Sequence, residues 1–379
     1  MVTLWAGYVL AAPSLIRRAA EAAPREVSLR SSCRGAPAPP LKKAGRVAPA
    51  TLGLRATLAL ALLVPAAAGA QSVAPEAPAP TGAADWTAPR TPWGAPDLQG
   101  VWDYRTATPL ERPRQFAGRE TMTAAEAAEY ERRHSERLDD YDRSPSVHAK
   151  WWLDNGRELT ADRRTSLLVD PPDGRIPGVT EDAKRRAAER NERRRQRSAD
   201  AAEYRGLTER CITFGMPRFP GAYNNNYHIL QTPTHVAIVA EMIHDARIVP
   251  LDGRPHLGAD LPQWHGDSRG YYDGDTLVVE TVNFSPKSAF RGSTTSLRLV
   301  ERFTRVGPET VNYEITVADP ATWTTSWTAL VPMTKTDQAV YEYACHEGNL
   351  GLRNILHNAR YEEDPDYAGK LPAPGKSRN

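Results

Sequence analysis

The sequence predicts a mainly β protein, an antiparallel barrel-like or sandwich domain with an α-helical insertion and a short C-terminal helix. After Cys211, short apolar runs are separated by turn sequences such as Asp252-Gly253, Asp273-Gly274-Asp275 and Gly307-Pro308. Helical patterns occur before this region, within about residues 121–205, and again at the C-terminal end. Because no helical pattern separates the apolar runs, the strands are expected to pair antiparallel.

The first expected elements are one strand and two helices. Residues 97–102, Asp-Leu-Gln-Gly-Val-Trp, predict the start of a strand. The sequence Thr123-Ala-Ala-Glu126 is a capping box, which predicts a helix to about residue 138 before the Ser144-Pro145 breaker. A second helix is expected over about residues 180–204.

The later elements are short strands followed by one helix. An apolar stripe in residues 349–360 predicts a short terminal helix. The expected strands are residues 227–231, 235–243, 246–250, 276–283, 297–306, 310–318, 323–332 and 339–344.

The N-terminal region resembles an export signal. In residues 54–70 one arginine precedes an apolar run, and Ala68-Gly69-Ala70 supplies the small residues of a cleavage site. Residues 1–53 are interpreted as a spurious or disordered leader, and residues 71–92 as a linker. One domain is then expected over residues 93–362, with a disordered tail over residues 363–379. The expected location is periplasmic or secreted.

Removal of this N-terminal region reverses the net charge. The first 70 residues hold 9 Lys or Arg and 2 Asp or Glu, out of 48 and 46 in the whole chain, so the remainder has 39 basic and 44 acidic side chains. The sequence therefore predicts no nucleic-acid partner. The apolar run is about half of the ~20 residues that a membrane-spanning helix needs, so no transmembrane segment is expected.

Two cysteines remain after cleavage at this signal. Cys211 and Cys345 form an even pair in an oxidising compartment, which favours a disulfide; two separate buried thiols are the alternative.

Four long segments resemble a widespread family of uncharacterised exported bacterial proteins. The resemblance covers about residues 91–360 and implies no established activity. The segments are Thr91-Pro-Trp-Gly-Ala-Pro-Asp-Leu-Gln-Gly-Val-Trp102, Val169-Asp-Pro-Pro-Asp-Gly-Arg-Ile-Pro177, Gly274-Asp-Thr-Leu-Val-Val-Glu-Thr281 and Tyr341-Glu-Tyr-Ala-Cys-His-Glu-Gly-Asn349.

Two shorter segments resemble the lipocalin, or calycin, family. Gly100-Val101-Trp102 is similar to the first-strand motif in which a tryptophan closes the barrel floor, and Thr336-Asp337 with Tyr341 is similar to a second motif. The resemblance implies a calycin-like barrel, although a helical insertion after the first strand departs from that family's pattern.

The candidate catalytic residues are histidines and carboxylates. His244 and Asp245, with Glu241 and Arg247, lie between two expected strands; they suit acid-base chemistry and anion binding, or form a solvated turn with local ion pairs. Glu280 lies in an apolar strand, where a carboxylate requires a partner inside the domain, and Arg298 and Arg302 are the candidates. Such a contact is either a structural buried pair or part of a functional pocket.

Other motifs give weaker signals. Gly266-Asp-Ser-Arg-Gly270 matches a nucleophile elbow in letters but lacks the following helix, so we expect a polar loop. His346 and Glu347 begin a zinc-protease motif, but Leu350 occupies the position of its second histidine. No metal site and no cofactor are specified. A stripe of Arg186, Arg190, Arg193 and Arg197 predicts a solvated helix face or contact with an anionic envelope surface.

Together these features predict an exported barrel-like protein that binds a small apolar or aromatic ligand inside the barrel. The alternative is a cofactor-independent lyase, isomerase or hydrolase that uses His244, Asp245, Glu280 and His346. The oligomeric state is not predicted. The expected ligand-binding residues are Tyr223, Asn226, Glu241, Arg247, Asn283, Arg302 and Trp264.

Overall fold

The computed structural model describes residues 86–143, 154–197, 199–288, 290–347, 349–364 and 366. All of these residues belong to a single compact unit. The predicted leader (1–53), the signal (54–70) and most of the linker (71–92) lie outside the described residues.

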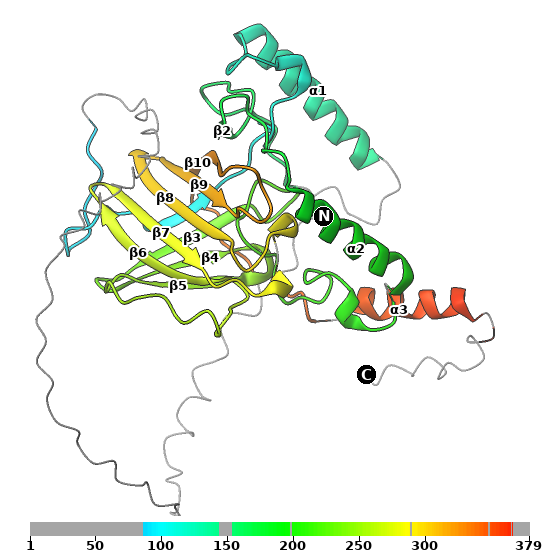
Figure 1. The fold of residues 1–379 in the computed structure, drawn as a ribbon. Helices are drawn as coiled ribbons and strands as arrows, with labels where there is room; N and C mark the ends of the chain where they lie inside the picture. The colour runs from blue at the N-terminus through cyan, green and yellow to red at the C-terminus, as the bar shows by residue number, and fades with distance from the viewer. Residues whose placement is uncertain are drawn as a thin grey trace, which may run out of the picture. The chain divides into compact units, whose positions relative to one another are not determined.

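A ten-stranded antiparallel sheet forms the body of the described unit (Figure 1). Its strand order is β5-β4-β3-β1-β10-β9-β8-β7-β6, with the short β2 paired to β10. The prediction of a mainly β, antiparallel fold is confirmed. The strands are β1 Gly100–Asp103, β2 Leu168–Asp170, β3 Asn226–Gln231, β4 His235–Ala240, β5 Ala246–Pro250, β6 Asp267–Asp273, β7 Thr276–Val282, β8 Arg298–Gly307, β9 Thr310–Ala318 and β10 Trp327–Thr336.

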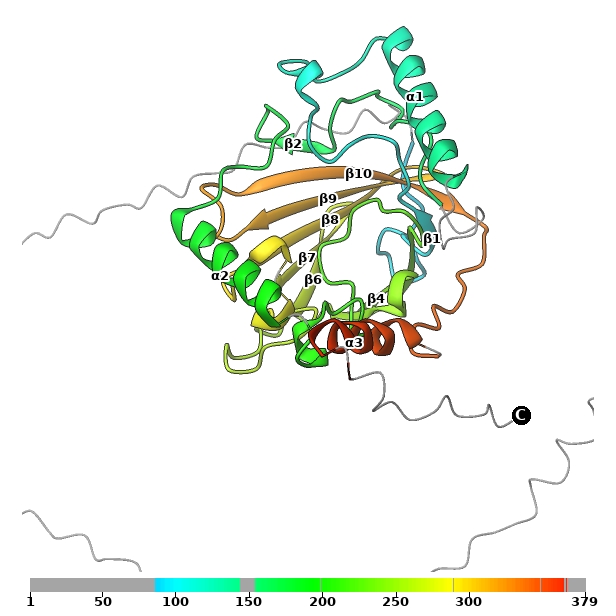
Figure 2. The ribbon, with the colours of Figure 1, turned by 90° about the vertical axis from the view of Figure 1, so that its right-hand side faces the viewer.

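The sheet curves around its apolar face without closing into a hydrogen-bonded barrel (Figure 2). Strands β5 and β6 are its two edges, and no backbone ladder joins them in the part of the chain that the structure describes. These edges nevertheless lie near one another. A Cβ atom on Gly270 of β6 would lie 2.8 Å from Val249 of β5, so side chains fill the seam.

The enclosed face is packed with side chains. Strands β8 and β9 alternate between buried and half-buried residues, which is the period of two expected for a sheet with one covered face. The core includes two large aromatic residues that are far apart in the sequence, Trp102 and Trp327, both fully buried. Arg305 lies over the Trp102 ring, with its guanidinium carbon 5.6 Å from the ring centre.

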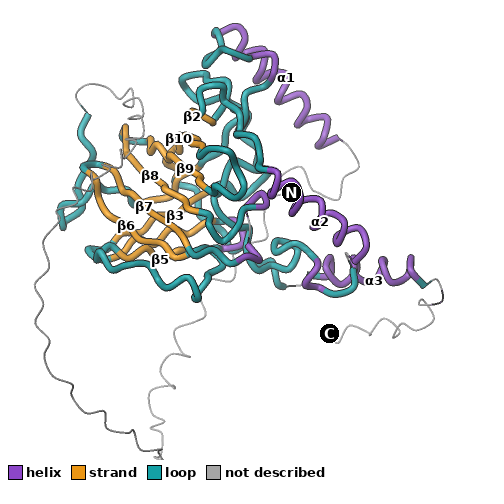
Figure 3. The backbone as a smooth tube through the Cα atoms, viewed as in Figure 1, coloured by secondary structure: helices purple, strands orange, loops and turns teal. Residues whose placement is uncertain are grey.

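Among the described residues, the α-helices are α1 Ala124–Arg143, α2 Glu181–Arg197 and α3 Leu350–Glu363. They lie outside the sheet (Figure 3). The predicted capping box at the start of α1 is confirmed, because the Glu126 carboxylate accepts a hydrogen bond from the Thr123 backbone N–H at 2.9 Å. Asn349 caps α3 through a hydrogen bond from the Leu352 N–H.

Several predicted boundaries differ from the structure. Residues 339–344 form no strand, and the chain there leads irregularly into α3. The segment Gly266 to Gly270, expected as a loop, instead begins β6. The strand was missed because its residues are small and polar. Glycine suits position 270, where a Cβ atom would lie 2.8 Å from Val249 on the opposite edge. No helix among the described residues is long and apolar enough to span a membrane.

Candidate functional site

A small cavity of about 150 Å³ lies at one end of the curved sheet. Four aromatic side chains contribute to its wall, from Tyr104, Phe214, Phe219 and Tyr223, and Met242 adds a thioether. The residues around it are Tyr104, Phe214, Arg218, Phe219, Gly221, Ala222, Tyr223, Asn224, Asn225 and Met242. A second hollow of about 320 Å³, beside the turn between β9 and β10, is lined mainly by Thr, Ser and Asp319, whose carboxylate caps local backbone groups.

The segment before β3 supplies most of the cavity wall and crosses the open end of the sheet in Figure 2. Asn225 holds this segment in place through two hydrogen bonds to the backbone of Gly221. Its side-chain NH2 group donates to the Gly221 carbonyl, and its side-chain oxygen accepts from the Gly221 N–H. Tyr104 follows β1 on the inward-facing side, and its backbone N–H donates to the Asn225 carbonyl at 2.9 Å. The hydrogen bond from Tyr104, just after β1, therefore helps to position the segment that forms the cavity wall.

Arg218 is the charged residue of the cavity wall. Its side chain is 2% exposed and Nη2 pairs with Asp245. Its guanidinium carbon lies 5.2 Å from the centre of the Phe214 ring, a cation-π geometry. The Nε atom is buried and has no hydrogen-bond partner among the described residues.

Asp245 is the centre of a buried polar network. Its carboxylate accepts hydrogen bonds from Thr213 Oγ1 at 2.9 Å and from the Phe214 backbone N–H at 3.1 Å. His265 Nε2 lies 3.2 Å from the same carboxylate. Burial by itself would raise the pKa of Asp245, but the hydrogen bond from His265 and the charge of Arg218 lower it below its ordinary value. Asp245 is therefore ionised near neutral pH.

This network is not a nucleophile triad. A triad needs the carboxylate on one imidazole nitrogen and the hydroxyl on the other. Here Thr213 Oγ1 and Asp245 both contact Nε2 of His265, at 2.6 and 3.2 Å. The Thr213 hydroxyl also donates to Asp245 and the residue is 1% exposed, so it is held as a structural donor.

A second buried network lies in the sheet interior. Arg247 of β5 makes two hydrogen bonds to Glu301 of β8, at 2.6 and 3.0 Å, and Tyr313 donates its hydroxyl to the same carboxylate at 2.5 Å. Because β5 and β8 are not neighbours in the sheet, this ion pair crosses the interior. A row of three tyrosine rings links the cavity to the Arg247–Glu301 ion pair. The centre of the Tyr227 ring lies 5.0 Å from that of Tyr104 and 5.8 Å from that of Tyr313.

No hydrogen bond or ion pair joins any two of the four predicted catalytic residues in the described structure. Asp245 lies in the Arg218 network, whereas His244 is exposed and its Nδ1 lies 3.1 Å from the Tyr343 carbonyl. His346 is exposed as well. Glu280 pairs with Arg298 at 2.9 Å, one of the two partners expected, but on the side of β7 opposite to the core residue Val279. It is therefore not an interior carboxylate.

The predicted ligand-binding residues are also dispersed. Tyr223 alone lines the cavity. Asn226 donates to Glu241 at 2.8 Å, and Arg247 is bound to Glu301. The remaining three lie elsewhere: Asn283 donates to the Leu257 carbonyl, Arg302 pairs with Asp273 at 3.0 Å, and Trp264 is 39% exposed in the loop before β6.

Sequence reasoning missed Tyr104, Phe214, Arg218, His265 and Glu301. The sequence did indicate that Glu301 is buried, because Glu301 lies between Leu299 and Phe303 on the apolar face of its strand. Arg218 and Phe214 had none, since the segment before β3 has no periodic pattern. Ser268, the candidate nucleophile, is buried in β6 and hydrogen-bonded to Thr281 at 2.9 Å. Within the described ranges no cluster of three or more His, Cys, Asp or Glu could hold a metal ion.

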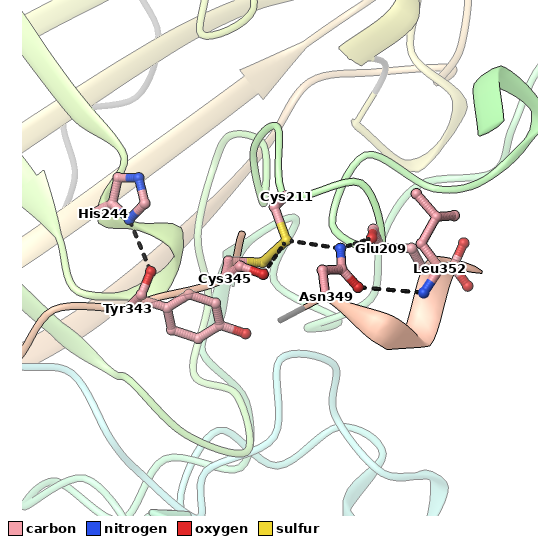
Figure 4. The surroundings of a disulfide bond; sticks show 7 residues. All are labelled: Glu209, Cys211, His244, Tyr343, Cys345, Asn349 and Leu352. Carbon is pink, nitrogen blue, oxygen red and sulfur yellow. Dashed lines mark hydrogen bonds between the residues drawn. A yellow bond between two sulfur atoms is a disulfide. The ribbon is translucent and has the colours of Figure 1, made fainter. Parts of the chain in front are cut away.

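The predicted disulfide between Cys211 and Cys345 is confirmed. It ties the segment that crosses the sheet to the C-terminal segment, 134 residues later (Figure 4). Asn349 strengthens the junction, because its side-chain amide donates to the Glu209 carbonyl at 3.0 Å. The exposed His244 contacts the same C-terminal segment through Tyr343, which gives it a structural role.

The arginine stripe on α2 is only partly a free surface. Arg186 donates to the Ala321 carbonyl and to Thr322, both at 3.0 Å, so it fixes the helix to the turn between β9 and β10. Arg190 lies against Gly292. Arg193 is exposed, and the side chain of Arg197 lies outside the described residues.

Comparison of the chain with protein-family models, curated proteins and solved structures found no match.

Proposed function

We propose that the mature protein is exported and binds a small aromatic molecule in the cavity at the end of its curved sheet. The observation that carries this proposal is the set of aromatic walls around a space of about 150 Å³. A cavity of this size holds one aromatic ring. Because the sheet interior is filled by its own side chains, we propose a ligand site at the end of the sheet and not inside it.

The aromatic wall residues suit such a ligand for two reasons. Phe214 is 48% exposed, which is costly for a large apolar side chain, and a bound ring would cover it. Tyr223 and Tyr343 share a hydrogen bond, and burial together with that bond raises the pKa of Tyr343 to about 12. Burial also raises the pKa of Tyr104, which lines the cavity, so its neutral phenol presents a hydrogen-bonding group beside apolar walls.

Export is proposed from two features. Residues 54–70 have the pattern of a cleavable signal. The Cys211–Cys345 disulfide fits an oxidising compartment such as the periplasm or the extracellular space. Both features agree with the resemblance to exported bacterial proteins.

Native mass spectrometry of gently purified mature protein tests the binding proposal. We expect a retained small molecule, or uptake of an added single-ring compound such as benzyl alcohol. Replacement Phe214→Ala should weaken binding about ten-fold, because the ring loses a stacking partner. Tyr271→Ala is the matched control, since Tyr271 is 50% exposed on β6 and does not line the cavity.

Two results would overturn the proposal. In the first, the protein retains no small molecule and takes up no added aromatic compound. In the second, wild type and Phe214→Ala bind the compound equally well.

The same spectra examine the alternative of a cofactor-independent enzyme. Its supporting observation is the Asp245–His265 pair, because the same carboxylate binds Arg218 of the cavity wall. Conversion of an added compound to a product of different mass would favour that alternative.

A further inference from the structure

Arg218 has unused hydrogen-bonding capacity at the cavity. Among the described residues, its one hydrogen bond joins Nη2 to Asp245, and Nε is buried without a partner. A buried N–H group without an acceptor is unfavourable, because it has lost its hydrogen bonds to water and gained none in the protein. Since Arg218 lines the cavity, a ligand oxygen there would supply the missing acceptor.

The counter-ion of Arg218 is shared with other donors. Asp245 also accepts hydrogen bonds from Thr213 and from the Phe214 backbone, and contacts His265. Arg218 is the charged residue among those that line the cavity. Glu241, the other buried carboxylate nearby, bonds to Asn226 and does not line the cavity.

We infer that the ligand carries a carboxylate, which binds the guanidinium of Arg218 while its ring lies between the aromatic walls. This inference rests on the proposed function and specifies the class of ligand as a small aromatic acid. Arginine suits this role because its planar guanidinium matches the geometry of a carboxylate. The cation-π contact with Phe214 holds the guanidinium plane in position.

Titration of the oxidised mature protein with benzoate, benzamide and benzylamine tests the inference. The three probes have similar size and differ in charge. Benzoate should bind about ten-fold or more tightly than benzamide, because a hydrogen bond to a charged group is stronger than one to a neutral amide. Benzylamine should bind most weakly.

Two variants should shift the benzoate-to-benzamide ratio in opposite directions. Arg218→Gln should reduce it to about one. Asp245→Asn should increase it, because the guanidinium loses its counter-ion, and loss of folding cannot produce such an increase. Arg254→Gln is the control: Arg254 is an exposed arginine paired with Asp252 and should leave the ratio unchanged.

The outcomes separate the two proposals. Equal binding of benzoate and benzamide to wild type would overturn the carboxylate inference and leave the aromatic site standing. Failure of all three probes to bind would overturn both. If circular dichroism shows that Arg218→Gln is unfolded, the wild-type ratio and its change in Asp245→Asn decide the question: a ratio near one, or no increase, refutes the inference.

Discussion

Glu280 and Glu301 show how far a sequence can be read at the scale of single residues. Both carboxylates lie in apolar strands, and sequence reasoning selected Glu280 as the one needing a partner inside the domain. In the structure Glu280 shares the outer side of the sheet with Arg298, whereas Glu301 is fully buried and bound to Arg247. One position along a strand exchanges the two sides of the sheet. The alternation was visible in the sequence, but which of the two sides faces the interior depends on how the sheet curves.

This difference predicts unequal effects of two equivalent substitutions. Glu301→Gln leaves Arg247 as an uncompensated buried charge, so it should lower the free energy of unfolding by about 3–5 kcal/mol. Glu280→Gln removes a half-exposed pair and should cost less than about 1 kcal/mol. Urea unfolding followed by circular dichroism measures both values.

The double variant Arg247→Met with Glu301→Leu is the internal control. Removal of both charges leaves no unpaired ion, so the double variant should be more stable than Glu301→Gln alone. Similar losses for Glu280→Gln and Glu301→Gln would contradict the assignment of the two sides of the sheet.

At the scale of elements, the sequence predicted the strands better than the connections between them. Strands β5 and β9 begin and end where predicted, because alternating apolar residues are bounded by turn sequences. The segment between α2 and β3 could not be placed, since it has no period and is fixed by distant groups such as the carbonyl of Asp154, which accepts from Asn225. The cavity is built mainly from this segment, so the site was less predictable than the sheet.

The disulfide should be the main attachment of α3. That helix has no buried residue of its own, and the disulfide at Cys345 lies five residues before its first residue, Leu350. Closing a chain loop of 134 residues contributes about 4–5 kcal/mol on the chain-entropy model. The double variant Cys211→Ser and Cys345→Ser should therefore be less stable by up to that amount and should exchange the amide hydrogens of α3 faster.

Hydrogen exchange with mass spectrometry under native conditions measures this effect. The amides of β8 and β9 serve as the reference, because these strands lie in the middle of the sheet and should keep their protection below the unfolding transition. Unchanged exchange in α3 after removal of the disulfide would mean that other contacts hold the helix.

At the scale of the whole molecule, the curved sheet encloses a filled interior. The sequence predicted a barrel-like sheet, but it could not show that Arg247, Glu301 and the aromatic residues fill the space in which a ligand was expected. Packing of this kind depends on side chains from strands far apart in the chain. The interior thus serves stability, and the proposed binding cavity lies at the end of the sheet.

The edge strands β5 and β6 touch, which brings this sheet close to a barrel. Substitution of Gly270 tests whether this contact exists in solution. A Cβ atom there would lie 2.8 Å from Val249 and 2.9 Å from Leu251, so Gly270→Ala should destabilise the protein by about 1–3 kcal/mol through overpacking. Gly178→Ala is the matched control, because a Cβ atom at Gly178 meets no other atom within 4 Å. Removing the opposing methyl groups with Val249→Ala should make Gly270→Ala less costly, a coupling measurable in a double-mutant cycle by thermal unfolding. If the two substitutions are instead additive, β5 and β6 do not touch in solution, and the sheet is open along that edge.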